Sequence, residues 1–413
     1  MSEAGTVVPG VERVGVVGAG TMGAGIAQIA ALGGYETLLH DPMPEALETG
    51  VERLRAALGK GVERGRWSEE EATAAARRIE GAGSLGDLSE CDLVVEAAPE
   101  ELALKRELFA ALAGACGPQA ILASNTSSLP VSAIAAEVPH PERVVGMHFF
   151  NPPALMKLVE VVATERSGEA ALEATTEVGR RMGRTPIRAR DSPGFIANRL
   201  ARPFSLESLR MLEQGVADAP TIDRVVRLGG GFRMGPFELL DLIGLDVNLS
   251  VAHSFYAQGG EPARWRPSPI QERMVGEGLL GRKTGRGFYS YEDTPQAASG
   301  APFVPQQYEK RTGAEVAEPT LDPAELAKID PAAEAILPRL LAQIANEAAF
   351  ALEEDVGSPA DMDTAMRLGF NWPRGPLELT ETIGRERAAE LLAELRAEHG
   401  DAYAPAPSLA AAS

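Results

Sequence analysis

Three glycines stand where the first apolar run of the sequence meets the first helical pattern. The run Val14–Val17 is followed by Gly18, Gly20 and Gly23, which gives the spacing G-x-G-x-x-G. The next residues, Ala24–Leu32, carry apolar side chains at helical intervals. A strand that turns abruptly into a helix needs glycine for the tight turn and for close helix–strand packing. This junction therefore predicts a strand–turn–helix unit of an α/β sheet.

The same alternation continues to about residue 190. Short β-branched runs recur between longer segments whose apolar residues lie three and four apart, as in strands joined by helices. Strands connected in this way form parallel sheets with helices on both faces. We therefore expect an α/β fold, a Rossmann-type doubly wound sheet, over residues 11–190. The predicted strands are 14–17, 37–39, 93–95, 120–123, 144–147 and 158–162.

Beyond this sheet the pattern becomes helical and is duplicated. Residues 198–244 and 338–384 are identical at 16 of 47 ungapped positions, with glycines and prolines in register. Two copies of one segment are expected to pack face to face, as in a two-fold contact. We predict a duplicated all-α domain after the sheet. Its expected parts are a first helical domain of the dimerisation type at 191–290, a linker at 291–330, a second helical repeat at 331–395 and a disordered tail at 396–413.

Composition excludes several classes of partner. A net charge of −20 opposes binding to nucleic acid or to an anionic membrane. No run approaches the roughly 18 apolar residues of a membrane span, and residues 1–10 lack the pattern of a secretory signal. Two cysteines cannot form a disulfide framework, which is typical of a reducing compartment. We expect a cytoplasmic protein that binds neither nucleic acid nor membrane, and we assign no metal ligands.

The glycine turn is a predicted site for the pyrophosphate of a dinucleotide. Backbone N–H groups at a helix start bind anionic groups. The next strand ends at Asp41, whose carboxylate is placed to bind a ribose 2′-hydroxyl and to repel a 2′-phosphate. NAD is therefore favoured over NADP; the alternative is that Asp41 merely caps the next helix. The turn residues are Gly18, Ala19, Gly20, Thr21, Met22 and Gly23.

His148 is the candidate for acid–base chemistry. It follows the run 144–147, and ligands of an open parallel sheet bind at the carboxyl ends of the strands. Glu160 interrupts another apolar run, where an unpaired charge would be costly. A contact between His148 and Glu160 would give the base a carboxylate partner. The alternatives are a core histidine with its hydrogen bonds satisfied and a glutamate on an edge strand.

A set of motifs, in this order and spacing, resembles the L-3-hydroxyacyl-CoA dehydrogenase family: GAGTMGAGIAQ, VVEAAPE with ELALKRELF, ASNTSSLP, GMHFFNPPALMKLVEVV and DSPGFIANRL. The resemblance covers residues 11–291, and the second helical copy resembles a duplicated form of that family. It implies oxidation of the 3-hydroxyl group of an acyl-CoA with NAD. His148 would be the acid/base, Glu160 would hold its imidazole, and Ser127 and Asn198 would hydrogen-bond the 3-oxygen of the substrate. The alternatives are a turn or cap residue for Ser127 and a polar residue on a helix surface for Asn198.

The resemblance also implies cofactor and CoA contacts. The expected NAD contacts are the turn 18–23, Asp41, Glu100, Lys105, Ser127, Asn151 and Lys283. The alternatives are a solvated helix pair for Glu100 and Lys105 and an ordinary loop lysine for Lys283. On the helix after Asp41 the family commonly offers CoA a serine and a lysine, whereas this sequence has Ala57 and Arg64 there. We assign Lys60 and Arg64 to CoA, with a solvated helix face as the alternative.

One active site is expected. Asn198 aligns with Pro338, so the second copy lacks the substrate-facing amide, and a structural role is predicted for 331–395. The expected substrate is a short-chain thioester such as 3-hydroxybutyryl-CoA, in β-oxidation and related fatty acid metabolism. The alternatives are 3-hydroxyadipyl-CoA, a CoA-free 3-hydroxy acid, or a catalytically silent NAD-binding scaffold. The duplication leaves both a monomer and a homodimer open.

Overall fold

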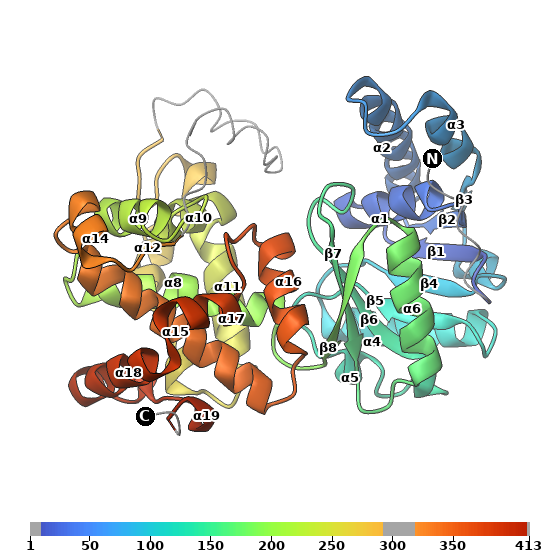
Figure 1. The fold of residues 1–413 in the computed structure, drawn as a ribbon. Coiled ribbons are helices and arrows are strands. Elements are labelled where there is room, and N and C mark those ends of the chain that lie inside the picture. Colours follow the sequence, from blue (N-terminus) through green and yellow to red (C-terminus); the bar gives the residue numbers. More distant parts are fainter. Residues whose placement is uncertain (1–9, 292–318, 411–413) are drawn as a thin grey trace. The chain divides into compact units, whose positions relative to one another are not determined.

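The computed structural model describes residues 10–291 and 319–410 (Figure 1). The chain divides into two compact units between Phe195 and Ile196. The first unit is an α/β sheet and the second is largely helical. Most of the predicted linker, and the last three residues of the predicted tail, lie outside the described residues. None of the helices described is both long and apolar enough to cross a bilayer.

The sheet of the first unit has eight strands in the order β3-β2-β1-β4-β5-β6-β7-β8. Neighbouring strands are parallel except for β6 and β7. The strand order reverses between β1 and β4, which is the switch point of a doubly wound sheet. The predicted fold class is confirmed. The strands are β1 Arg13–Val17, β2 Glu36–His40, β3 Ile79–Ala82, β4 Leu93–Glu96, β5 Ile121–Ser124, β6 Val144–Phe149, β7 Leu158–Ala163 and β8 Thr185–Arg190.

Two strands and one strand direction differ from the prediction. Ile79–Ala82 and Thr185–Arg190 were not predicted as strands, because each has few apolar residues. Strand β7 runs antiparallel to β6, since the connection at 150–157 holds no helix and is too short for a parallel crossover. The reversal has a consequence for chemistry, because it sets His148 directly opposite Glu160.

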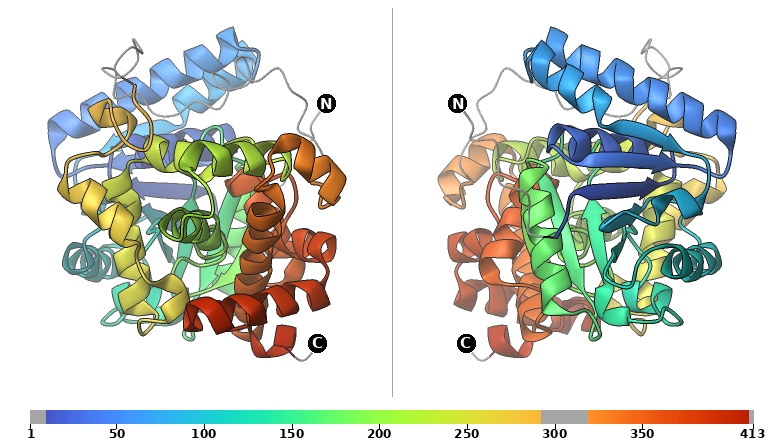
Figure 2. Two further views of the ribbon diagram at one scale, coloured as in Figure 1. Left: turned by 90° about the vertical axis from the view of Figure 1, so that its left-hand side faces the viewer. Right: turned by 90° about the vertical axis from the view of Figure 1, so that its right-hand side faces the viewer.

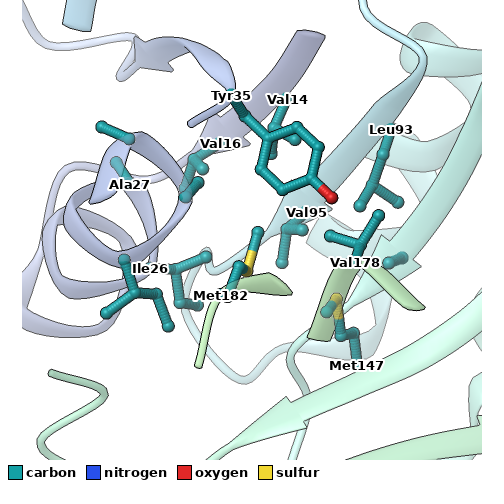
Figure 3. Packing of buried hydrophobic residues seen from close by; sticks show 14 of the residues in the cluster. Val14, Val16, Ile26, Ala27, Tyr35, Leu93, Val95, Met147, Val178 and Met182 are labelled. Carbon is teal, nitrogen blue, oxygen red and sulfur yellow. The ribbon is translucent and has the colours of Figure 1, made fainter. Parts of the chain in front are cut away.

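Helices pack on this sheet around a buried core. Alternate strand residues share one face of the sheet, and in β1 and β4 these residues are apolar and fully buried. They pack against α1 and α6, so the strands and the helix that follows β1 are held in fixed positions (Figure 3). The labelled members of this core include Val14, Val16, Leu93 and Val95 from the strands, and Ile26, Val178 and Met182 from the α1 and α6 regions. The helices are α1 Thr21–Leu32, α2 Pro44–Glu63, α3 Glu69–Arg77, α4 Leu102–Ala115, α5 Val131–Ile134 and α6 Glu169–Arg181.

The second unit holds the two helical copies. Most of the helices of the first copy recur in the second about 140 residues later, so α9, α10 and α11 correspond to α16, α17 and α18. The first copy has α7 Ala197–Leu200, α8 Arg202–Glu213, α9 Ala219–Leu228, α10 Pro236–Ile243, α11 Leu245–Gln258 and α12 Pro269–Gly276. After the undescribed segment come α14 Pro323–Ile329, α15 Ala333–Glu353, α16 Pro359–Gly369, α17 Pro376–Ile383, α18 Arg385–His399 and α19 Pro407–Ala410.

Reciprocal ion pairs join the two copies. Arg199 pairs with Glu347, and Arg339 pairs with Glu207. A shift of 140 residues converts one pair into the other. Such an exchange is what a two-fold contact produces, since each partner offers the same surface. The duplicated domain therefore packs face to face, with α15 of the second copy in contact with α7, α8 and α9 of the first (Figure 2).

The predicted disordered tail is wrong for residues 396–410. Helix α18 extends to His399, and a 3-10 turn at Asp401–Tyr403 precedes α19. The side chains of Tyr403 and Leu409 are buried, and the Asn346 amide bonds to the backbone of Ala404 and Ala406. The proline- and alanine-rich composition suggested disorder, but the buried side chains of Tyr403 and Leu409 and the amide of Asn346 hold the segment, and the Tyr403 hydroxyl also bonds to Arg339 and Glu207.

We expect Tyr403→Ala to lower the free energy of unfolding by about 3 kcal/mol or more, because it removes a fully buried aromatic ring. Urea denaturation of the whole chain measures this change. Asp401→Ala is the control, because it removes only an ion pair with Arg396 at the surface, worth about 1 kcal/mol or less. Equal stability of Tyr403→Ala and wild type would contradict the packing of this segment.

Candidate active site

The turn between β1 and α1 requires two of its glycines. Gly18 has φ +101°, and a Cβ atom there would lie 2.6 Å from the carbonyl oxygen of Ala97. A Cβ on Gly23 would lie 1.7 Å from the carbonyl oxygen of Gly18. A Cβ on Gly20 would meet nothing within 4 Å. Gly18 and Gly23 therefore shape the turn, whereas Gly20 borders open space at the start of the helix.

The start of α1 fits an anionic cofactor group. Gly20 is the N-cap residue of this helix, so no side chain caps it. Thr21 and Met22 begin the first turn, which holds no acidic residue. The first N–H groups of a helix have no partner within the helix, so they are suited to the pyrophosphate of NAD. The predicted residues thus fit this cofactor.

Asp41 follows β2, and its carboxylate accepts a hydrogen bond from the glycine turn. Its Oδ2 accepts a hydrogen bond from the backbone N–H of Ala19 at 2.9 Å. Its Oδ1 accepts one from the N–H of Met43 at 3.0 Å. The second bond lies before α2, whose N-cap residue is Met43 and which has no side-chain cap, so Asp41 does not cap that helix as the alternative interpretation has it. Asp41 therefore ties the ends of β1 and β2 together beside the turn.

His148 and Glu160 are cross-strand neighbours and form the predicted contact. The distance from His148 Nδ1 to Glu160 Oε2 is 2.7 Å, and Glu160 is 0% exposed. The rings of Phe150 and Phe195 lie 4.6 Å and 5.8 Å from the imidazole, centroid to centroid. A carboxylate oxygen accepts hydrogen bonds, so this contact suits the tautomer of His148 that carries the ring proton on Nδ1. In that tautomer Nε2 has the lone pair and can take a proton from a ligand.

Ser127 lies in the loop that follows β5. Asn125, two residues earlier, accepts a hydrogen bond from the N–H of Phe149 at 2.8 Å. This bond ties the loop to the residue next to His148. Ser127 and His148 therefore belong to adjacent strand ends, because β5 and β6 are parallel neighbours.

Glu100 holds the same loop from the other side. One oxygen of Glu100 accepts from the Thr126 hydroxyl at 2.7 Å and from the N–H groups of Ser127 and Ser128 at 2.9 and 3.0 Å. Burial raises the pKa of Glu100, but these hydrogen bonds and the ammonium of Lys105 outweigh it, so the pKa lies below its usual range. An ionised Glu100 therefore fixes the backbone around Ser127.

Glu96 also belongs to this site, although it was not predicted from the sequence. Its Oε1 lies 2.6 Å from the Nζ of Lys105, and its Oε2 accepts from the Ser124 hydroxyl at 2.6 Å. Lys105 is only 1% exposed, with its Nζ also 3.4 Å from Glu100. The alternative of a solvated pair of Glu100 and Lys105 is therefore wrong. In the sequence Glu96 is a charged residue in an apolar run, as Glu160 is, and this pattern could have identified it.

The remaining predicted residues have ordinary local surroundings. Asn151 is exposed just after β6, and Lys60 and Arg64 are exposed at the end of α2. In the second unit, Lys283 pairs with Asp246 at 2.5 Å. Asn198, also in that unit, lies in α7 and is partly exposed. Within the described part of the chain, no group of three His, Cys, Asp or Glu residues is placed to hold a metal ion.

In the first unit, the predicted residues cluster at one edge of the sheet. The carboxyl ends of β1, β2, β4, β5 and β6 carry the glycine turn, Asp41, the Glu96–Lys105–Glu100 network, Ser127 and His148. Five neighbouring strands end there, and this is the edge at which ligands of an open parallel sheet bind. The arrangement is suited to holding a dinucleotide beside a general base.

Comparison with known proteins agrees with this arrangement. The family model for the NAD-binding domain of 3-hydroxyacyl-CoA dehydrogenase matches residues 13–192. The model for the C-terminal domain of that enzyme matches two segments, 194–291 and 336–412. These two segments correspond to the two helical copies, and the second reaches into the C-terminal segment predicted to be disordered.

Relatives match over most of their own length. A 3-hydroxyadipyl-CoA dehydrogenase of Escherichia coli is 37% identical, with 95% of each chain covered. A probable 3-hydroxybutyryl-CoA dehydrogenase of Bacillus subtilis is 41% identical over 68% of this chain and 98% of its own. The crystal structure of a 3-hydroxybutyryl-CoA dehydrogenase from Escherichia coli K12 has a TM-score of 0.86, at 35% identity, and covers 97% of this chain and 98% of that one. The chain therefore belongs to the NAD-dependent 3-hydroxyacyl-CoA dehydrogenase family, in a form whose C-terminal domain is present twice.

Proposed function

We propose that this protein oxidises short-chain L-3-hydroxyacyl-CoA thioesters to 3-oxoacyl-CoA, with 3-hydroxybutyryl-CoA and acetoacetyl-CoA as the substrate and product. The contact between His148 and the fully buried Glu160, at the cofactor edge of the sheet, is the observation that carries the proposal. The names of the relatives from Bacillus subtilis and Escherichia coli support the short acyl chain.

His148 is the general base of the proposed reaction. Glu160 holds Nδ1–H, so Nε2 removes the proton of the 3-hydroxyl group. NAD⁺, when bound, accepts the hydride from C3. The carboxylate of Glu160 then stabilises the imidazolium that forms. In the direction of reduction, the same nitrogen returns the proton to the 3-oxygen.

Ser127 and Asn198 are the proposed hydrogen-bond donors to the 3-oxygen. A positioned donor of this kind lowers the barrier by roughly 3–4 kcal/mol. Ser127 is suited to the role because Glu100 and Asn125 fix its loop beside the end of β6. Asn198 is assigned from its place in the motif DSPGFIANRL.

The proposed NAD contacts are the turn 18–23, Asp41, Glu100, Ser127, Asn151 and Lys283. Lys105 acts through Glu100, because its ammonium is enclosed by Glu96 and Glu100. Lys60 and Arg64 bind the anionic nucleotide of CoA, and the guanidinium of Arg64 can hold a phosphate with two hydrogen bonds. These exposed cations offset the repulsion between the substrate and a chain of net charge −20.

A dicarboxylic substrate, 3-hydroxyadipyl-CoA, is the second candidate. The relative of that name matches this chain over 95% of both lengths, second helical copy included. We expect kcat/KM to be higher for 3-hydroxybutyryl-CoA than for 3-hydroxyadipyl-CoA, and free 3-hydroxybutyrate to be inactive. The reverse order of the two thioesters would assign the dicarboxylic substrate instead. We place the reaction in the cytoplasm, with one active site in each chain and a monomer or a homodimer as the assembly.

Replacing the proposed base tests the mechanism. We expect His148→Gln to lower kcat for acetoacetyl-CoA reduction by about a thousandfold, within the range of general acid–base catalysis. The measurement is NADH consumption at saturating substrates. NADH binding, followed by fluorescence, is the control and should be unchanged. Undiminished turnover in His148→Gln would rule out this residue as the acid/base.

Two glycine substitutions separate the cofactor contact from the shape of the turn. Gly20→Ala should leave the melting temperature unchanged, since its Cβ meets nothing, and should raise the Kd for NADH by crowding the pyrophosphate. Gly23→Ala should lower the melting temperature because of its clash with Gly18. Calorimetry and NADH titration measure both effects. Normal NADH affinity in Gly20→Ala would argue against the proposed cofactor position.

A further inference from the structure

Asn198 lies in a short helix next to α8. Helix α7 has four residues, and only Ala201 separates it from α8. Residues 194–200 are buried apart from Asn198, which is partly exposed. Whatever holds the neighbouring residues therefore also bears on the direction of the Asn198 side chain.

Arg199 anchors this segment through hydrogen bonds to the second copy. Its side chain is 0% exposed, and its Nε donates to Glu347 Oε1 at 2.7 Å. Its Nη1 and Nη2 donate to the two oxygens of Glu354 at 2.7 and 3.1 Å. Two parallel bonds of this kind fix the plane of a guanidinium as well as its position. Because successive residues of a helix point about 100° apart, holding Arg199 also sets the direction of Asn198.

Glu347 is fixed from its other side by the first copy. Its Oε2 accepts hydrogen bonds from Arg264 Nε at 3.1 Å and from Trp265 Nε1 at 2.9 Å. The Arg264 guanidinium also lies 3.6 Å from Glu354. Two arginines thus face two glutamates, and the buried charges of Arg199 and Glu347 are compensated.

The other half of the pseudo-two-fold contact has a neutral residue in the place of Glu354. Arg339 is the counterpart of Arg199, and it follows Pro338, which stands in the place of Asn198. The counterpart of Glu354 is Gln214, whose amide oxygen accepts from Arg339 Nη2 at 2.7 Å. The second carboxylate is therefore found on the half that carries Asn198, and a neutral amide on the half that does not.

We propose that Glu354, together with Glu347, is a positioning residue of the second helical copy. Through Arg199 these glutamates hold the Asn198 amide in the direction in which it meets the 3-oxygen of the substrate. This inference rests on the proposed role of Asn198 in the reaction. The second copy then contributes to the active site, in addition to the structural role predicted for residues 331–395.

The test compares Glu354→Ala with Gln214→Ala. The two residues are counterparts, and both are solvent-accessible, the side chain of Glu354 being 47% exposed. We expect Glu354→Ala to lower kcat for acetoacetyl-CoA reduction by about ten- to a hundredfold, the loss typical of a displaced active-site group. The KM for NADH should stay unchanged, and Glu354→Gln should recover part of the loss. Gln214→Ala should leave kcat unchanged, with a shift in melting temperature similar to that of Glu354→Ala.

A double variant shows whether Glu354 acts through Asn198. If it does, Asn198→Ala/Glu354→Ala should have the same kcat as Asn198→Ala alone, because coupled residues are not additive. Equal kcat values for Glu354→Ala and Gln214→Ala, or additive losses in the double variant, would overturn the positioning role.

The same measurements separate this inference from the proposed function. A wild-type protein that leaves acetoacetyl-CoA untouched, or full kcat in Asn198→Ala, would overturn the proposed function and the inference with it. An active wild type and a slow Asn198→Ala, together with an unimpaired Glu354→Ala, would overturn the positioning role alone.

Discussion

A buried carboxylate must find a hydrogen-bond donor or a cation, because its desolvation is otherwise too costly. This requirement shapes both units of the protein. Glu160 meets the imidazole of His148 and Glu96 meets Lys105 in the first unit. Glu347 meets Arg199 and Glu207 meets Arg339 in the second. Each carboxylate fixes its partner in one position, and in two cases that partner bears on the proposed chemistry, His148 directly and Arg199 through its neighbour.

Features that depend on residues close together in the sequence were predictable from it. The glycine turn, the alternation of strands and helices and the duplication all follow from spacing, and the contact of His148 with Glu160 followed from a charge within an apolar run. Features that depend on distant partners were not. Strand β8, Thr185–Arg190, is polar in sequence and becomes a strand because β7 offers it an edge. The order of residues 401–410 likewise depends on Asn346, some 60 residues away.

A duplication within one chain has freedom that a homodimer lacks. In a homodimer both halves of a two-fold contact have the same sequence, so a change in one half appears in the other. Here the halves have diverged, with Asn198 and Glu354 on one side and Pro338 and Gln214 on the other. One half is thus able to support a reaction while the other serves the packing, and both keep the arginine–glutamate pair that joins them.

We infer that Glu160 sets the tautomer of His148 and leaves Nε2 as the base. Nitrogen-15 NMR of histidine-labelled protein tests it directly, since the chain has five histidines and His148→Gln assigns the signal. We expect the neutral ring of His148 to carry its proton on Nδ1, and Glu160→Gln to weaken this preference. A proton found on Nε2 in the wild type would rule out Nε2 as the base, because that nitrogen would have no lone pair to accept the proton of the substrate.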